Sequence, residues 1–362
     1  MDRTSTVPFT SQPVARLKNF IASAAVVVLA LAFYRISATN RRYLGELYGS
    51  AGFSFTGEEF FTTAAIAYTL LLALFFLTER EPGVSKSLRF WRALSDFLRT
   101  PGAWLRRGLP RDDRVAVLAT LLKALFGPLM VMSAMVISMS LISHGIALAD
   151  GRAWHNGFRA WFDQHGYWFL LQVLILADLL IFAVGYLVEL PRLGNEIRSV
   201  DPTLLGWAVA LLCYSPFSFV LGMFLSAPGM GMLRFEDPTL HFSLNALVLL
   251  LMAIFTWASV ALGFKASNLT HRGIVDRGPY NFIRHPAYTC KNLAWWIGSI
   301  PIVLAAFDQS RWDGIQAFAS VIGWTMLYVL RAVTEEDHLR GVDGEYAAYA
   351  SKVRYRFIPG VV

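Results

Sequence analysis

Long runs of apolar residues, separated by shorter polar stretches, dominate this chain. A helix needs about 20 mainly apolar residues to cross the hydrocarbon core of a bilayer. Eight segments approach or exceed that length, and we expect each to be a membrane-spanning helix. They are residues 20–34, 60–77, 124–148, 167–190, 204–225, 242–264, 293–307 and 315–333. The pattern therefore predicts an all-α, polytopic transmembrane protein of about eight spans.

Composition supports this fold class and excludes several others. Hydrophobic residues make up 56% of the 362 residues and charged residues only 16%, whereas soluble domains carry about 25% charged residues. Intrinsic disorder is excluded because its signature is low hydrophobicity. Two cysteines, Cys213 and Cys290, are too few for a disulfide framework or a Cys/His zinc site, so we expect no metal.

The positive charges predict an orientation in the membrane. With eight spans, one face holds both termini and three alternate loops, and these carry 24 of the 32 Lys and Arg residues. The opposite face carries seven, and Lys123 lies at the end of a span. Because cytoplasmic loops are enriched in Lys and Arg, we expect both termini in the cytoplasm. The net charge of +7 is explained by these loops, and we expect no nucleic-acid partner.

The chain divides into two regions by the chemistry it carries. Residues 1–200 form a transmembrane region to which no role can be assigned, and residues 201–362 carry the candidate chemistry. Within the first region, residues 85–104 place Leu88, Trp91 and Leu98 at helical spacing, with arginines on another face. This pattern favours an amphipathic helix lying on anionic headgroups over an ordinary solvated helix.

Asp178 lies inside an apolar stretch at membrane depth. A carboxylate there costs several kcal/mol unless it is paired or protonated. Two interpretations stay open: a functional group at the site of a membrane-borne substrate, or a structural hydrogen bond to another helix.

A second concentration of polar residues lies near the C-terminus. Arg284, His285 and Tyr288 precede the seventh expected span, and Arg331 with the pair Glu335–Glu336 ends the eighth. Only a few residues join these two spans, so they must form an antiparallel hairpin whose two open ends lie on one membrane face. Cations, carboxylates and aromatic rings would then meet there. Such a pocket suits a zwitterionic ligand with an aromatic base.

The spacing of these residues resembles a known family. The motifs that carry the resemblance are Gly278-Pro279-Tyr280, Arg284-His285-Pro286-x-Tyr288, Glu335-Glu336, Tyr346-x-x-Tyr349 and Arg356-x-Ile358-Pro359. Together they resemble the membrane methyltransferase superfamily, which includes isoprenylcysteine carboxyl methyltransferases and phosphatidylethanolamine N-methyltransferases. The resemblance covers about residues 264–362. One departure is Cys290, where many members of the family carry glycine.

The resemblance implies a cofactor and roles for particular residues. The cofactor would be S-adenosylmethionine, and the residues implied to bind it are Tyr280, Arg284, His285, Pro286, Tyr288, Glu335 and Glu336. Arg331 and Arg356 would adjoin the reacting groups, and Asp178 is the membrane-embedded candidate for catalysis. The expected partners are membrane lipids and a lipid or lipid-linked methyl acceptor.

Two other functions remain as alternatives. Sterol-reductase-like enzymes that use NADPH share the two-helix hairpin, although the paired glutamates are more typical of the methyltransferases. A non-catalytic membrane scaffold with a vestigial pocket is the third class. Equilibrium binding of S-adenosylhomocysteine, of NADPH or of neither would separate the three.

Overall fold

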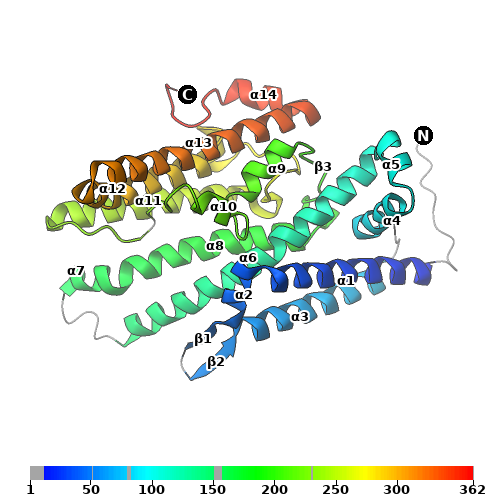
Figure 1. Cartoon of the computed structure of the whole chain (residues 1–362), viewed down its shortest axis with the longest axis horizontal. Helices are drawn as coiled ribbons and strands as arrows, with labels where there is room; N and C mark the ends of the chain where they lie inside the picture. The colour runs from blue at the N-terminus through cyan, green and yellow to red at the C-terminus, as the bar shows by residue number, and fades with distance from the viewer. Residues whose placement is uncertain (1–11, 51, 80–82, 151–156, 230, 362) are drawn as a thin grey trace. The chain divides into compact units, whose positions relative to one another are not determined.

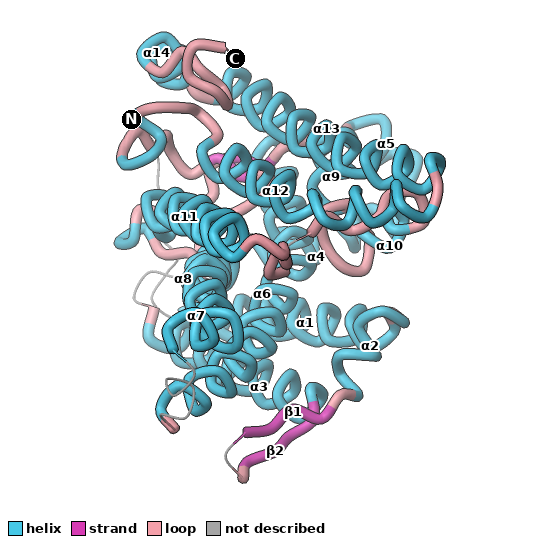
Figure 2. Tube along the Cα trace, turned by 90° about the vertical axis from the view of Figure 1, so that its left-hand side faces the viewer, coloured by secondary structure: helices cyan, strands magenta, loops and turns pink. Residues whose placement is uncertain are grey.

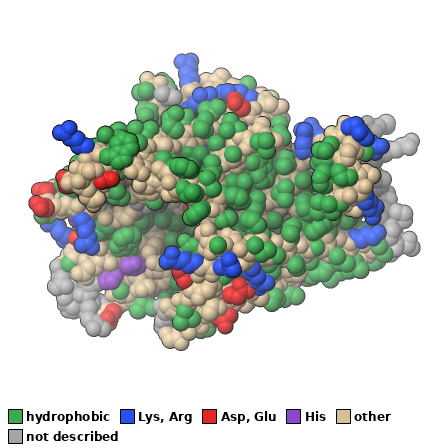
Figure 3. Space-filling view, in the orientation of Figure 1, with side chains coloured by type: hydrophobic (Ala, Val, Ile, Leu, Met, Phe, Trp, Pro, Cys, Tyr) green, Lys and Arg blue, Asp and Glu red, His purple; other side chains and the backbone are tan. Residues whose placement is uncertain are grey.

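A computed structural model describes residues 12–50, 52–79, 83–150, 157–229 and 231–361. Seven helices in these described residues are long and apolar enough to cross a membrane, which makes the chain an all-α, multi-pass membrane protein. The chain forms two compact units, Met1–Met132 and Ser133–Val362. Hydrophobic side chains cover much of the face shown in Figure 3, as expected where helices face lipid.

The first unit is built on the first two spans. Its elements are α1 (Gln12–Ile36), α2 (Ala38–Gly45), the antiparallel hairpin β1 (Leu47–Ser50) and β2 (Phe53–Thr56), α3 (Gly57–Thr78), α4 (Lys86–Arg99), α5 (Pro101–Arg107) and the start of α6 (Arg111–Ala149). Thr56 caps α3 in a capping box with Glu59, which satisfies two backbone donors at the helix start.

The amphipathic segment predicted at 85–104 contains two helices, α4 and α5. Phe90 and Ala93 of α4 are buried, and the Trp91 indole donates a hydrogen bond to the Ala22 carbonyl of α1. At least part of its apolar face therefore packs against the protein, while Leu98 remains 68% exposed.

The second unit is a bundle of antiparallel helices. Its elements are the rest of α6, α7 (Gly157–Trp161), α8 (Tyr167–Leu187), β3 (Ser199–Val200), α9 (Leu204–Leu211), α10 (Ser218–Gly222), α11 (Pro238–Leu262), β4 (Thr270–His271), α12 (Pro286–Gln309), α13 (Arg311–Val342) and α14 (Glu345–Lys352). In Figure 1 the long helices α8, α11, α12 and α13 run alongside one another, and Figure 2 shows α8 and α11 nearly end-on. The core packs Phe162, Tyr167 and Leu171 against Val248 and Met252 of α11.

The fifth expected span, 204–225, is wrong as a continuous helix. Helix α9 ends at Leu211, and the chain turns at Ser215–Pro216 before the short α10. Pro216 has no backbone N–H to continue the ladder. Beyond α10 the backbone is extended and its polar groups bond to side chains: the Ser226 N–H to the Ser320 hydroxyl, and the Gly229 N–H to the Ser299 hydroxyl. The fifth expected span is therefore two short helices, α9 and α10, followed by a segment without regular secondary structure.

The other seven expected spans correspond to helices that are mostly longer than the apolar runs themselves. Residues 293–307 are part of α12, and residues 315–333 are part of α13. A single residue, Ser310, joins these two helices and caps α13 through its hydroxyl. The predicted C-terminal hairpin is thus present, and its two helices are joined by one residue.

Candidate functional site

The open end of the α12–α13 hairpin gathers the C-terminal motifs. His285 directly precedes α12, and Pro286 occupies the first helical position, where the missing N–H of proline costs nothing. The C-terminal tail pairs with this segment, because the Arg284 and His285 N–H groups donate to the carbonyls of Tyr355 and Arg356, each at 2.9 Å. Residues about 70 positions apart are thereby held side by side.

Glu336 is the centre of this assembly. Its side chain has no exposed surface, and its carboxylate accepts hydrogen bonds from Arg284 at 2.8 Å, Arg340 at 2.8 Å and Arg356 at 3.2 Å. The His285 Nε2 lies 3.1 Å from its other oxygen. Both carboxylate oxygens of Glu336 are thus engaged by side chains of the protein itself. Glu336 therefore binds the start of α12 and the C-terminal tail to α13.

His285 belongs to the same network. Its ring lies parallel to that of Tyr288, with 5.5 Å between centroids, and beside Phe357. The side chain is only 8% exposed. His285 therefore orients Tyr288 and Glu336.

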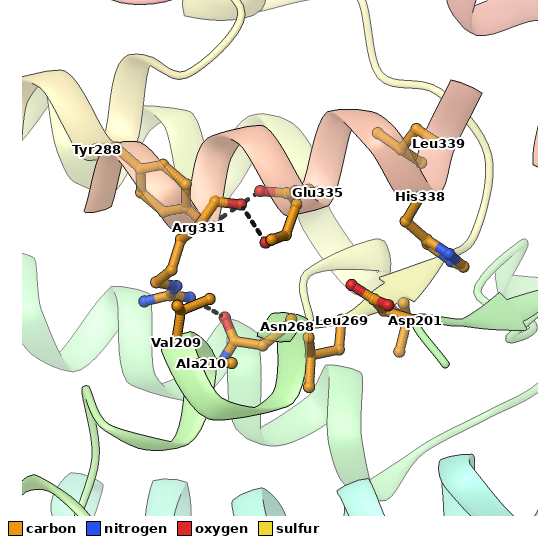
Figure 4. Close-up of a pocket in the computed structure, with 13 residues that line it drawn as sticks. Asp201, Val209, Ala210, Asn268, Leu269, Tyr288, Arg331, Glu335, His338 and Leu339 are labelled. Carbon is orange, nitrogen blue, oxygen red and sulfur yellow. Dashed lines mark hydrogen bonds between the residues drawn. The ribbon is translucent and has the colours of Figure 1, made fainter. Parts of the chain in front are cut away.

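A pocket with about 380 Å³ of empty space, partly open to solvent, lies beside this network. Figure 4 shows it between α13, α9 and the loop that contains Asn268. Its lining residues are Asp201, Gly206, Val209, Ala210, Asn268, Leu269, Thr270, Tyr288, Arg331, Thr334, Glu335, His338 and Leu339. Three of the residues expected from sequence, Tyr288, Arg331 and Glu335, line the pocket. Tyr280, Arg284, His285, Pro286, Glu336 and Arg356 are not among the lining residues.

Arg331 provides the positive charge of the pocket. Its guanidinium lies against the rings of Tyr214, Tyr288 and Tyr328, between 5.1 and 5.7 Å from their centroids. It donates one hydrogen bond, at 2.8 Å, to the Asn268 side-chain oxygen. The side chain is 5% exposed.

Glu335 provides the negative charge. The Tyr288 hydroxyl donates to its Oε2 at 3.0 Å, and its side chain is 43% exposed. Tyr280 lies nearby, and burial together with the Glu335 carboxylate raises the pKa of Tyr280 well above its ordinary value. Tyr280 therefore stays a neutral phenol. The Tyr349 hydroxyl holds its backbone by donating to the Tyr280 carbonyl at 3.0 Å.

The loop between α11 and β4 is fixed by side chains from several elements. The Asn268 N–H donates to the Tyr186 hydroxyl at 2.8 Å, and the Leu269 carbonyl accepts from the Asp201 N–H at 2.8 Å. Arg272 donates to the carbonyls of Asn195 and Gly185. These bonds set the position of Asn268 under Arg331.

Asp178, the membrane-embedded candidate, is not among the residues that line the pocket. The Ser259 hydroxyl of α11 donates a hydrogen bond to its carboxylate, and Lys291 of α12 interacts with it electrostatically. The Lys291 ammonium lies over the rings of Phe255, Trp295 and Tyr328. The bond to Ser259 is the hydrogen bond to another helix expected under the structural interpretation, and a catalytic role of Asp178 stays a prediction.

Sequence reasoning missed Asp201, Asn268 and His338 as pocket residues. Asn268 lies in the polar stretch 265–291, but a single amide there carries no spacing signal. Asp201 and Asn268 come together only through the antiparallel pairing of β3 with β4, two strands of two residues each. Strands so short leave no periodic pattern.

Comparison with known proteins gives one match. A family model described as "Protein of unknown function (DUF1295)" matches residues 220–353, which extend from α10 into α14 and include the hairpin. No curated protein and no solved structure matches the chain.

Proposed function

We propose that this protein is a membrane-embedded methyltransferase that uses S-adenosylmethionine to methylate a lipid or lipid-linked acceptor. The observation that carries the proposal is the pocket at the end of the α12–α13 hairpin, where Arg331, Glu335 and Tyr288 come together. A buried guanidinium, a half-exposed carboxylate and aromatic rings complement an amino acid joined to an aromatic base.

The donor set of the pocket fits this cofactor. Arg331 makes no salt bridge with any described residue and so has N–H groups for a carboxylate. The contacts of Glu335 with Tyr288 and His285 involve only its Oε2, which leaves Oε1 for an ammonium or for hydroxyl groups. When bound, S-adenosylmethionine supplies an electrophilic methyl group, which passes to the acceptor as the carbon–sulfur electron pair returns to sulfur.

The protein's own residues contribute position and exclusion of water. Glu336 and His285 hold the tail and Tyr288 in place, and Tyr288 in turn orients Glu335. Alignment of reactants in a dry site supplies a large share of the rate in such displacements. The apolar helices around the pocket favour an acceptor that arrives from the bilayer.

Binding by the purified full-length protein tests the proposal. We expect S-adenosylhomocysteine to bind in calorimetry and NADPH not to bind. Binding of NADPH alone would indicate the reductase alternative, and binding of neither would favour a scaffold. Mass spectrometry of a lipid extract incubated with methyl-labelled cofactor would then identify the acceptor.

A further inference from the structure

Arg331 is a buried charge without a counter-charge. No described carboxylate lies within salt-bridge distance of it, and its one hydrogen-bonded partner is the neutral amide of Asn268. The other groups around its guanidinium are the three tyrosine rings. An ionised side chain inside a membrane protein normally pairs with another charge or marks a binding site.

Neighbouring buried cations in the same unit are compensated. Arg284, whose side chain is 11% exposed, is paired with Glu336, and Lys291 interacts with Asp178. The lack of a carboxylate at Arg331 is therefore a local feature of the pocket.

Asn268 adds a second unused donor at the same place. Its side-chain oxygen accepts from Arg331, but its Nδ2 is fully buried and has no hydrogen-bond partner among the described residues. A buried amide N–H left unpaired is costly. The amide cannot be turned round to relieve this cost without losing the bond to Arg331.

The backbone next to Asn268 is also in a costly conformation. Leu269 has a φ of 61°, in the left-handed region that a branched side chain rarely adopts. Backbone strain of this kind persists only where surrounding contacts enforce it. It is found most often at binding and active sites. Here the contacts are the bonds from Asn268 to Tyr186 and from Asp201 to Leu269.

We propose that Arg331 and Asn268 form an anion subsite that binds a carboxylate or phosphate oxygen of the pocket's ligand. The guanidinium and the Nδ2 amide donate to that oxygen, and the three tyrosine rings exclude water around it. This inference rests on the proposed function only for the identity of the ligand. Its two possible sources are the amino-acid end of the cofactor and an acidic lipid from the bilayer.

The test is Asn268→Asp in the full-length protein, which removes the amide donor and places an internal carboxylate beside Arg331. The matched control is Asn281→Asp, which makes the same charge change at an exposed position. Calorimetry compares S-adenosylhomocysteine with 5′-methylthioadenosine, which lacks the amino-acid carboxylate. Thermal-shift measurements compare oleate with oleyl alcohol.

If the cofactor is the source, Asn268→Asp weakens S-adenosylhomocysteine binding about ten- to a hundred-fold and leaves 5′-methylthioadenosine within about twofold. If an acidic lipid is the source, oleate raises the Tm of the wild type more than oleyl alcohol does, and Asn268→Asp abolishes that difference. Asn281→Asp behaves as wild type in both cases. Should Asn268→Asp not fold, Arg331→Gln must show the same losses.

The subsite is disproved if neither anion is preferred over its uncharged analogue by the wild type, or if the preference survives in the variants. A wild type that binds neither adenosine compound contradicts the proposed function, and the oleate comparison still decides the subsite by itself.

Discussion

Two adjacent glutamates have opposite environments at this site. Glu336 has no exposed surface and is bonded by three arginines and His285, whereas Glu335 is 43% exposed and faces the pocket. Successive residues on a helix point about 100° apart. One carboxylate can therefore hold the tail while its neighbour remains available to a ligand.

This difference predicts distinct effects of the same substitution. Glu336→Gln should lower the free energy of unfolding by about 3–5 kcal/mol, because it leaves the largely buried Arg284 guanidinium without its counter-charge. Glu335→Gln should leave the Tm nearly unchanged and weaken S-adenosylhomocysteine binding about tenfold. Denaturation and calorimetry in detergent measure the two effects. The exposed Glu345→Gln serves as control, and equal destabilisation by Glu336→Gln and Glu335→Gln would contradict the assignment.

The sequence reveals the motif residues but not this division between them. The Arg284-His285-Pro286 and Glu335-Glu336 pairs stand out by spacing, and the one-residue link at Ser310 explains why they meet. Which glutamate turns toward the pocket depends on how the tail packs, and that information is not local. Asp201 and Asn268 were not predicted as pocket residues for the same reason: their positions depend on packing and not on local sequence.

At the scale of elements, residues 204–225 show that hydropathy does not reveal where an apolar run stops being helical. Their apolar composition matches that of the helical spans, yet Pro216 interrupts the run and the extended backbone beyond bonds to side chains of α12 and α13. Non-helical backbone at membrane depth is tolerated where protein buries it. Close backbone contact is essential here, because a Cβ on Gly298 would lie 2.2 Å from the Gly229 carbonyl oxygen.

Gly298→Ala should therefore destabilise the protein by about 1–3 kcal/mol, the usual cost of overpacking. Gly341→Ala is the matched control, since Gly341 is also in a helix but a Cβ there meets nothing within 4 Å. Replacing an exposed helical glycine with alanine is normally neutral or stabilising. Thermal unfolding of the two variants in the same detergent tests this expectation. Equal Tm values would show that α12 can move away from the segment around Gly229.

The β3–β4 bridge predicts a pH dependence. Burial lowers the pKa of His271 below its ordinary 6.5, although the Asp343 carboxylate, 2.7 Å away, acts in the opposite direction. The unfolded chain then binds a proton more readily than the folded one, so this contribution to stability is present above about pH 6.5 and is lost as the pH falls. Tm should drop between pH 7.5 and 5.5, and less so in His271→Gln. An identical pH slope in both proteins would exclude His271 as the cause.

At the scale of the whole molecule, the path of residues 204–237 bears on the predicted sidedness of the chain. Helix α11 runs from Pro238 to Leu262, and β3 pairs with β4 beyond its C-terminal end. The segment from α9 to Asp237 must therefore pass from one end of α11 to the other. If this segment crosses the membrane as well as the seven long helices, the number of crossings is even, as the prediction of cytoplasmic termini from the Lys and Arg count requires.

Cysteine labelling tests this topology in intact cells. Single cysteines replace Glu236, which is exposed just before α11, and Glu345, which is exposed at the start of α14, after Cys213→Ser and Cys290→Ser remove the native thiols. We expect a membrane-impermeant maleimide to label position 236 from outside and position 345 only after permeabilisation, because three long helices, α11, α12 and α13, lie between the two positions and an odd number of crossings places them on opposite sides of the bilayer. Labelling of both from outside would contradict three crossings by α11, α12 and α13. Labelling of position 345 alone would place the pocket away from the cytosol, where S-adenosylmethionine is made, and the proposed cofactor would then be untenable.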